Sequence, residues 1–357
     1  MNRNVLSRRL LVGVALATLA VAGCASNDPE PTSTSAGASE FGALSGSIKA
    51  SGASFPNAFY QKALDEFAKV APDLDVTYNS VGSGTGKKEF GSNLVDFAGS
   101  DSTVKDGDGP TPGSYLYVPT VAAPITVSYN LSGVSKLQLG PDTLAKIFGR
   151  EIKKWNDPAI AADNAGVTLP DKNITVVHRS DGSGTTNNFT KYLVAAAPTA
   201  WKLGSGDTVA WAADTQAGEK NTGVAQLIKQ SDGSIGYVDF ADAKASGLTF
   251  AALKNKDGQY VAASLDGATS AVAGAEVKDD LTFNPLNAAG ATSYPITAPT
   301  YLLVRPAYTD ATVGKNVKGF IKWLLTDGQQ FADGVGYAKL PTALQQKALA
   351  QLDKVQA

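Results

Sequence analysis

Cysteine and histidine are almost absent from this sequence of 357 residues, which contains one of each, Cys24 and His178. A single cysteine cannot form an intramolecular disulfide, and a single histidine cannot build a His-rich zinc or iron site. The sequence also lacks a D-x-D-x-D-G loop of the kind that binds calcium. We therefore expect neither a metal site nor another cofactor.

An excess of positive charge is also missing. The formal net charge is −2 and charged residues make up 18% of the chain, so the totals show no basic patch for nucleic acid. No apolar run approaches the roughly 20 residues that a membrane-spanning helix needs. The hydrophobic content of 43% is nevertheless that of a globular protein, and the length allows two domains of ordinary size.

The first residues have the pattern of an export signal. Arg3, Arg8 and Arg9 precede an apolar stretch of thirteen residues, 10–22, which suits the core of a secretory signal peptide. The stretch ends in Val-Ala-Gly-Cys24, which resembles the lipobox of bacterial lipoproteins, where the cysteine is lipidated, typically with palmitate, and becomes the new N-terminus. We expect residues 1–23 to be a lipoprotein signal peptide and the mature protein to be extracytoplasmic, anchored to the cell membrane through its lipid.

Removal of residues 1–23 would take away three arginines and no acidic residue. The mature chain would then carry 28 basic and 33 acidic side chains, a net charge of −5. The overall field of such a protein repels anions, so any anion site in it must depend on local geometry.

The mature chain is predicted to begin with a tether. Residues 24–46 are rich in Ser, Thr, Ala, Gly and Pro and have few large apolar side chains, which indicates a flexible segment. From Ser47 onward, short strands alternate with amphipathic helices, which is typical of an α/β fold. In such folds ligands bind at the carboxyl ends of strands.

Four turns made of small residues follow predicted strands at 47–51, 75–79, 95–99 and 174–178. They are Gly52-Ala53-Ser54-Phe55-Pro56, Gly82-Ser83-Gly84-Thr85-Gly86, Gly99-Ser100-Asp101-Ser102 and Arg179-Ser180-Asp181-Gly182-Ser183-Gly184-Thr185. Three of them precede predicted helices, whose first N–H groups and partial positive charge suit an oxyanion. Arg179 adds a planar fork that matches two oxygens of a tetrahedral anion. Each turn alone is also compatible with a simple helix cap, so the prediction depends on all four together.

Enzyme motifs near these turns are incomplete. Residues 81–88 lack the first glycine and the hydroxyl of a phosphate-binding Walker loop, and neither Ser83 nor Ser183 lies in a G-x-S-x-G elbow. A serine nucleophile would need a base, and His178 is the one imidazole available. His178 is next to Arg179 on a strand, so the two side chains face opposite ways, and we expect His178 to be packed in the fold.

At these turns the sequence resembles the substrate-binding protein of the phosphate-specific ABC transporter, which is of the periplasmic-binding-protein type. The resemblance covers nearly all of residues 47–357. Its markers are the turns at 52–56, 82–84 and 179–185 together with Val95-Asp96-Phe97-Ala98-Gly99-Ser100-Asp101, Ile152-Lys153-Lys154-Trp155-Asn156-Asp157 and Ser234-Ile235-Gly236-Tyr237. Ser54 stands where the family commonly has threonine, and it keeps the hydroxyl.

The resemblance implies a role for each site residue. The residues that would bind phosphate are Ser54, Phe55, Ser83, Asp101, Arg179, Ser183, Gly184 and Thr185. Asp101 would accept a hydrogen bond from a protonated phosphate oxygen, and Asp181 would hold Arg179 in place without touching the anion. The implied partners are inorganic phosphate and the permease and ATPase complex of an ABC transporter, and the implied role is phosphate capture and transport without catalysis.

The implied fold has two α/β lobes, two crossings between them and a ligand cleft in between. We expect the first lobe to comprise residues 47–125 and 295–357 and the second to comprise 126–294. A ligand held by both lobes would favour their closure. The residues alone leave alternatives open: a binding protein for sulfate, molybdate or arsenate, a secreted Ser-dependent phosphatase, or a structural lipoprotein in which the turns are only caps.

Overall fold

The structure is a computed structural model that describes residues 40–356. The predicted signal peptide and the lipidated Cys24 lie outside the described residues. Within 40–356 no helix is long and apolar enough to cross a membrane.

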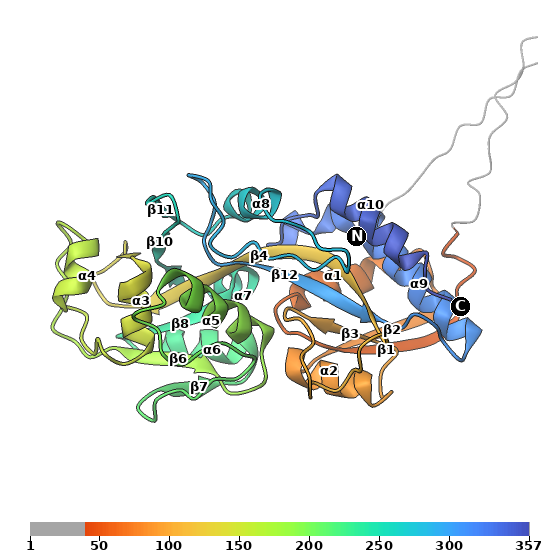
Figure 1. The fold of residues 1–357 in the computed structure, drawn as a ribbon, viewed down its shortest axis with the longest axis horizontal. Coiled ribbons are helices and arrows are strands. Elements are labelled where there is room, and N and C mark those ends of the chain that lie inside the picture. The colour runs from red at the N-terminus through yellow and green to blue at the C-terminus, as the bar shows by residue number, and fades with distance from the viewer. Residues whose placement is uncertain (1–39, 357) are drawn as a thin grey trace, which may run out of the picture. The chain divides into compact units, whose positions relative to one another are not determined.

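Strands and helices alternate along most of this range, as the sequence predicts (Figure 1). The strands are β1 (Gly46–Gly52), β2 (Leu74–Ser80), β3 (Phe97–Ser100), β4 (Leu116–Asn130), β5 (Gln138–Leu139), β6 (Thr175–Arg179), β7 (Gln216–Gly218), β8 (Ser234–Asp239), β9 (Thr249–Phe250), β10 (Ala252–Lys254), β11 (Tyr260–Val261) and β12 (Thr297–Val304). The helices are α1 (Asn57–Phe67), α2 (Ser83–Gly91), α3 (Pro141–Phe148), α4 (Pro158–Asp163), α5 (Gly184–Ala196), α6 (Lys220–Gln230), α7 (Phe240–Ala245), α8 (Leu265–Ala273), α9 (Ala311–Leu325) and α10 (Thr342–Leu352), with two short 3-10 turns, Asp327–Phe331 and Asp333–Val335.

One curled sheet runs through the molecule in the strand order β2-β1-β3-β12-β4-β8-β6-β7, with β9 paired to β4. The strands at each end of the sheet pair in parallel: β1 with β2 and β3, and β6 with β7 and β8. Its middle is antiparallel, because β12 pairs with β3 and β4 and β4 also pairs with β8. A separate small sheet contains β11, β10 and β5.

The long strand β4 divides the sheet into two lobes. Residues 116–124 of β4 pair with β12, and Ile125 begins the pairing with β8. We call the elements β1–β3, α1, α2, α9 and α10 the first lobe and the elements β6–β8, α3 and α5–α7 the second lobe. In Figure 1 the first lobe lies on the right in red and blue, and the second lies on the left in yellow and green. Strands β4 and β12 run between them.

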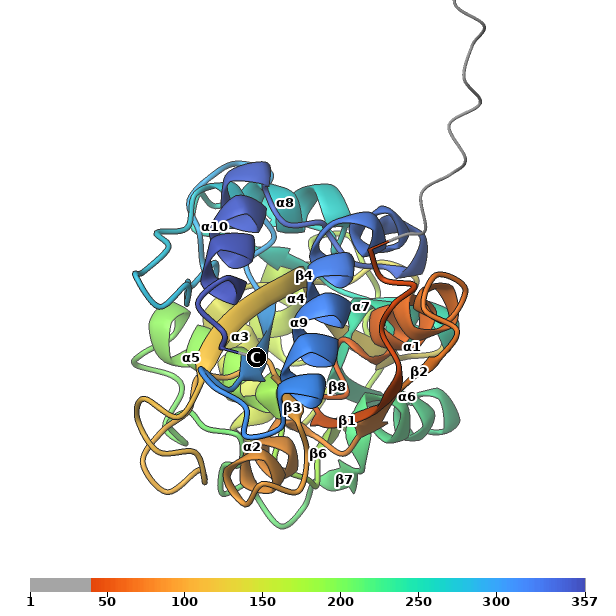
Figure 2. The same ribbon diagram turned by 90° about the vertical axis from the view of Figure 1, so that its right-hand side faces the viewer.

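Amphipathic helices cover the sheet of the first lobe. In α1 the side chains of Phe59, Tyr60, Ala63 and Phe67 are buried, which follows the helical period. Helix α1 lies next to α9 (Figure 2). Between them the ring of Phe67 meets that of Phe320 edge to face at 5.1 Å between centroids. Burial of one large aromatic side chain contributes on the order of 2–3 kcal/mol, so these contacts secure both helices.

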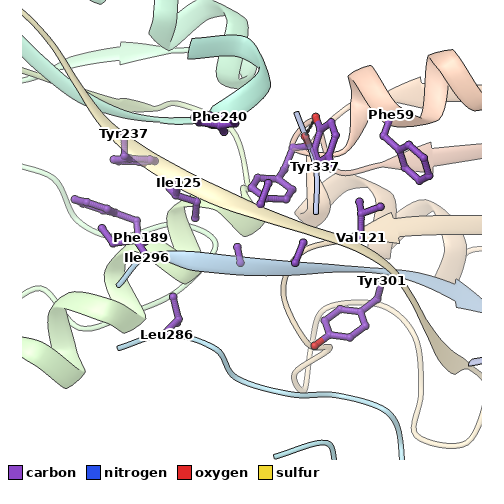
Figure 3. Packing of buried hydrophobic residues seen from close by; sticks show 14 of the residues in the cluster. Phe59, Val121, Ile125, Phe189, Tyr237, Phe240, Leu286, Ile296, Tyr301 and Tyr337 are labelled. Carbon is purple, nitrogen blue, oxygen red and sulfur yellow. Dashed lines mark hydrogen bonds between the residues drawn. The ribbon is translucent and has the colours of Figure 1, made fainter. Parts of the chain in front are cut away.

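The core continues from one lobe to the other around β4 and β12. Val121 and Ile125 on β4 and Ile296 just before β12 are buried between aromatic rings of both lobes (Figure 3). Tyr237 lies on the side of the second lobe and Tyr337 on the side of the first (Figure 3). The crossing strands are therefore buried on both faces, which is expected of strands inside a sheet that is covered on both sides.

The predicted tether ends earlier than residue 46. Phe41 and Leu44 are buried against the first lobe, and Gly46 already pairs with Leu74 as the first residue of β1. These two apolar side chains give little signal in the sequence, because small and polar residues surround them. Residues 41–46 belong to the folded lobe.

Candidate functional site

All four predicted turns leave the carboxyl ends of strands in the large sheet. The turns after β1, β2 and β6 lead directly into α1, α2 and α5. Helices α2 and α5 begin at Ser83 and Gly184, inside the predicted turns, so the turn residues themselves form the first turn of each helix. Their unpaired N–H groups are therefore at the place where an anion would meet the positive end of the helix.

Close backbone packing brings the first and third turns together. Gly52 has φ +146°, and a Cβ atom there would collide with the backbone of Gly99. The carbonyl of Gly52 accepts hydrogen bonds from the N–H groups of Val81 and Gly82, at 2.9 and 2.8 Å, which adds the second turn. Only glycine combines this φ value with such a close approach.

The predicted residues of the first lobe are buried at this junction. Ser54, Phe55 and Ser83 have little or no exposed surface. The hydroxyl of Tyr337 donates to the carbonyl of Phe55 at 2.6 Å, which fixes the first turn. The Ser83 hydroxyl accepts from the Asp101 N–H at 3.2 Å and lies 3.4 Å from the Asp101 carboxylate, so the second and third turns meet.

Asp101 is a buried carboxyl group with few protein partners. It is 3% exposed, and the Thr300 hydroxyl donates to its Oδ1 at 2.8 Å. Burial raises the pKa of Asp101 to about 7, although the Thr300 hydrogen bond and the positive charge of Arg179 act in the opposite direction. The carboxyl group can therefore change its protonation state near neutral pH, where phosphate also does.

Arg179 and Asp181 form a buried pair in the second lobe. The Arg179 Nε donates to Asp181 Oδ1 at 2.7 Å, and Nη2 pairs with the other carboxylate oxygen. Burial alone would raise the pKa of Asp181, but the hydrogen bonds and charge of Arg179 outweigh it and lower that pKa below its usual value. Nη1 has no hydrogen-bond partner among residues 40–356 and remains available to a ligand.

The remaining predicted residues begin α5. Ser183 caps the helix by accepting from the Thr186 N–H at 3.1 Å, while Gly184 and Thr185 are its first two residues. Thr185 is fully buried. The cap uses the Ser183 hydroxyl oxygen as an acceptor, so its hydrogen is still free to donate.

Contacts between the lobes close the site. The Gly84 N–H donates to the Gly182 carbonyl at 3.0 Å, and the Asn188 side chain donates to the Asp101 carbonyl at 2.6 Å. A Cβ atom on Gly184 would lie 2.6 Å from Ser83 Oγ and 2.7 Å from Asp101 Oδ2. The predicted residues of the two lobes therefore lie together in one buried cluster.

The structure adds residues that the sequence reading missed. They are Asn188, Asn221, Tyr237 and Thr300. The hydroxyl of Tyr237 accepts from the Arg179 N–H at 3.1 Å, and Asn221 lies between the lobes with its amide 3.2 Å from the Ser54 hydroxyl. Tyr237 belongs to the marker Ser234-Ile235-Gly236-Tyr237, whereas Asn221 and Thr300 carry no local pattern.

His178 is packed away from the serines of the cluster. Its ring stacks on Trp211 at 4.8 Å between centroids and an angle of 16°. Its Nδ1 lies 2.8 Å from the Arg179 carbonyl and its Nε2 lies 3.0 Å from the Thr215 hydroxyl, so both ring nitrogens have partners. Burial lowers the pKa of His178. This arrangement agrees with the prediction of a packed histidine.

Metal-binding groups are not gathered here or elsewhere in residues 40–356: this range holds no cluster of three or more His, Cys, Asp or Glu side chains suited to an ion. A cavity of about 490 Å³ lies beside Asp101 and Asn188, with Lys191 on its wall. The cluster itself offers hydroxyl, backbone N–H and guanidinium donors from both lobes and one titratable acceptor. Such a set can bind an oxyanion that carries a proton.

The comparisons with known proteins identify the family. Residues 31–328 match the model of the PBP superfamily domain. The chain is 37% identical to the phosphate-binding protein PstS of Pasteurella multocida over 310 residues, 85% of this chain and 89% of the relative. It is 33% identical to the phosphate-binding protein PstS 3 of Mycobacterium leprae over 355 residues, 94% of this chain and 96% of the relative.

Solved structures show the same fold. A high-affinity periplasmic phosphate-binding protein crystallised with phosphate at pH 8.5 aligns with a TM-score of 0.71 at 22% identity, over 85% of this chain and 93% of the other. A phosphate-binding protein from Stenotrophomonas maltophilia aligns with a TM-score of 0.67 at 21% identity, over 86% and 94%. The fold is the two-lobed type that the sequence predicts. The chain belongs to the PstS phosphate-binding protein family within the PBP superfamily.

Proposed function

We propose that this protein captures inorganic phosphate between its two lobes outside the cytoplasm and delivers it to the permease of an ABC transporter. The observation that carries the proposal is the position of Asp101. It is a buried carboxyl group among donors from both lobes: the Ser83 hydroxyl lies 3.4 Å from one of its oxygens, and Arg179 is close enough to lower its pKa. Family membership supports the same assignment.

Asp101 accounts for a choice between oxyanions. Phosphate keeps a proton at neutral pH and can donate it to the carboxylate, whereas sulfate carries none and would place a second anion against Asp101. An uncompensated buried contact of this kind costs several kcal/mol, on the order of hundredfold or more in affinity. Arsenate also keeps a proton, so Asp101 does not separate arsenate from phosphate.

We propose the ligand set Ser54, Phe55, Ser83, Asp101, Arg179, Ser183, Gly184 and Thr185, with Asp181 orienting Arg179. The turns supply N–H groups at the starts of α1, α2 and α5 and hydroxyls from the serines and the threonine. We propose that these donors are divided between the predicted lobes, residues 47–125 with 295–357 and residues 126–294, with residues 41–46 added to the first lobe. The change of partner of β4 between Pro124 and Ile125 supports the first of these boundaries.

We further propose that Cys24 carries the lipid and holds the protein at the cell membrane. The lipobox pattern before Cys24 and the positive, apolar start of the chain support this assignment. Mass spectrometry of the protein purified from membranes should find a diacylated N-terminal cysteine, and Cys24→Ala should release the protein into the soluble fraction. A protein that stays on membranes after this substitution would contradict the anchor.

Titration of the signal-free, phosphate-stripped protein with phosphate, sulfate, molybdate and arsenate tests the function. We expect phosphate to bind at least about hundredfold more tightly than sulfate at pH 8. Asp101→Asn should lose most of this preference, because the amide can donate to sulfate. Asp163→Asn, which changes a carboxylate bound to Gly140 and Tyr260 outside the cluster, serves as the control. Tight sulfate or molybdate binding by the natural protein would refute the phosphate assignment.

A hydrolase is the competing function, and the partners of His178 speak against it. Both ring nitrogens are engaged with Arg179 and Thr215, so no imidazole is available to activate Ser83 or Ser183. We therefore propose a binding role without catalysis. Multiple-turnover release of phosphate from a phosphomonoester, abolished by Ser183→Ala, would establish the hydrolase instead.

A further inference from the structure

Asn221 joins the hydroxyls of the two lobes. It is the second residue of α6, it is fully buried, and its Nδ2 lies 3.2 Å from Ser54 Oγ and 3.2 Å from Thr185 Oγ1. Ser54 belongs to the first lobe and Thr185 to the second. One amide group therefore touches two proposed phosphate ligands across the closed cleft.

These contacts decide what the two hydroxyls can do. A hydroxyl has one hydrogen to donate and two lone pairs that accept. The Asn221 amide occupies a lone pair of each hydroxyl, and neither hydroxyl donates to an acceptor within residues 40–356. Each hydrogen is thus left for a guest in the cleft, and a hydroxyl that accepts a hydrogen bond becomes a stronger donor.

No other polar contact explains the placement of the Asn221 side chain. Its Oδ1 is buried and has no hydrogen-bond partner in the described part of the chain. A buried amide that serves the fold normally has partners at both ends, because an unsatisfied buried oxygen is destabilising. Among residues 40–356, the two hydroxyls of the site are the only polar partners of the Asn221 side chain.

The backbone before Asn221 is held in an unfavourable conformation. Lys220 has φ +59°, in the left-handed region that a side chain rarely adopts. Its N–H donates to Asp181 Oδ1 at 3.0 Å, the same oxygen that accepts from Arg179 Nε. One carboxylate therefore fixes both the guanidinium of the site and the start of the helix that carries Asn221.

We propose that Asn221 is a positioning residue that makes the hydroxyls of Ser54 and Thr185 obligatory donors to the bound anion. This inference rests on the proposed function. With both hydroxyls committed as donors, Asp101 is the acceptor for the proton of the guest. Asn221 thereby limits the site to an anion that donates one proton to Asp101 and accepts hydrogen bonds from the surrounding donors through its other oxygens.

Asn221→Asp gives the sharpest test, because it keeps the size of the side chain and replaces a donor by an acceptor. The hydroxyl hydrogens should turn toward the new carboxylate, and phosphate affinity at pH 8 should fall at least hundredfold. The loss should diminish at pH 5, where the introduced carboxyl group is partly protonated and can donate again. A purely structural role would produce no such pH-dependent recovery.

Further variants keep the test decisive. Asn221→Ala should weaken phosphate binding by about five- to tenfold through misaligned hydroxyls. In a protein that already carries Ser54→Ala and Thr185→Val, the same Asn221→Ala change should cause no further loss of affinity. Asn255→Ala is the matched control. The side chain of Asn255 is also a buried amide, and its Nδ2 donates only to backbone carbonyls. This control substitution should lower the melting temperature and leave phosphate affinity unchanged.

The outcomes separate this inference from the proposed function. Natural protein that does not bind phosphate would refute the function and the inference together. Natural protein that binds phosphate, with Asn221→Asp or Asn221→Ala binding within twofold of it, would refute the role of Asn221 alone. A full effect of Asn221→Ala in the variant lacking both hydroxyls would also refute it.

Discussion

Lys87 and Asp207 form an ion pair between the lobes that should contribute to closure. Lys87 is on α2 in the first lobe and is 1% exposed, and its Nζ lies 2.9 Å from Asp207 Oδ2 in the loop after α5. Within the first lobe the same ammonium also contacts Asp108 and the Ser102 hydroxyl. When the lobes separate, Lys87 would keep these two partners and lose Asp207.

Asp207→Asn isolates the energy of the pair across the cleft. The amide oxygen can still accept from the Asn187 side chain, which now lies 2.8 Å from Asp207 Oδ1, whereas the amide nitrogen would face the ammonium group. Removing one partner of a buried pair costs about 3–5 kcal/mol when the remaining charge is stranded. Lys87 is not stranded, and the contact is not aligned as a hydrogen bond, so we expect about 1.5–3 kcal/mol.

This loss should appear in phosphate affinity, since only the closed form contains the pair. At about 1.4 kcal/mol for each factor of ten, the variant should bind phosphate roughly tenfold to hundredfold more weakly. Calorimetric titration would measure the affinity, and small-angle scattering would report whether saturating phosphate still compacts the protein. The ligand-free variant should unfold at nearly the natural temperature.

Asp108→Asn is the matched control. It removes the partner of Lys87 that stays beside it in both open and closed forms, so it should lower stability more than it lowers affinity. Lys87→Met combined with Asp207→Asn completes a double-mutant cycle, in which a coupling energy of at least about 1 kcal/mol is expected. Phosphate affinity of Asp207→Asn within twofold of the natural protein would refute the role of this pair in closure.

Three other predictions follow from single features of the site and the core. Sulfate should compete better with phosphate as the pH falls below about 7, because the protonated Asp101 can donate to sulfate; competition titrations at pH 6 and 8 that show equal selectivity would contradict this. Gly184→Ala should weaken phosphate binding at least about hundredfold, since its Cβ would lie 2.6 Å from Ser83 Oγ in the closed form, while thermal unfolding of the ligand-free protein changes little. Asp239→Asn should stabilise the protein at pH 8 but not at pH 4, because burial raises the pKa of Asp239 well above its usual value. The amide oxygen can still accept the hydrogen bond from the Asp242 N–H that caps α7. Urea unfolding that shows no gain in stability at pH 8 would refute this prediction.

The sign of the Asp239 effect follows from linkage. The folded protein retains a proton on this carboxyl group at pH values where the unfolded chain has already released it. The free energy of unfolding therefore falls as the pH rises from about 4, the usual pKa of an aspartate, toward the raised pKa of the folded state. The neutral amide has no proton to lose, so its advantage grows across this pH range and reaches roughly 1–3 kcal/mol at its upper end.

Local patterns in the sequence predict the strands of the site well. The strand before Ser54 was expected at 47–51 and spans Gly46–Gly52, and the strand before Arg179 was expected at 174–178 and spans Thr175–Arg179. Alternation of apolar residues and the small-residue turns that follow are both local signals. The turns, and hence most of the predicted site residues, could be found for the same reason.

Contacts between distant parts of the chain have no such signal. Asn221 meets Ser54 across 167 residues, and Thr300 meets Asp101 across 199. Thr300 lies inside a fully buried strand. Asn221 is the second residue of α6, and residues 219–222 around it contain neither the serine nor the glycine that marks the other turns. The sequence does not indicate that α2 and α5 begin inside their glycine-containing turns, because glycine is a poor helix former.

The proposed site would recognise an anion without a surplus of positive charge. Arg179 is neutralised by Asp181, and Asp101 adds either nothing or a negative charge, so the remaining attraction comes from hydroxyls and from the N–H groups at the starts of α1, α2 and α5. Fixed dipoles of this kind act strongly only at contact distance and in a site from which water is excluded. Because no single lobe provides all of these donors, strong binding requires closure. The ion pair of Lys87 and the amide of Asn221 both join the lobes in that closed form. Contacts that exist only in the closed form therefore contribute to the free energy of anion binding.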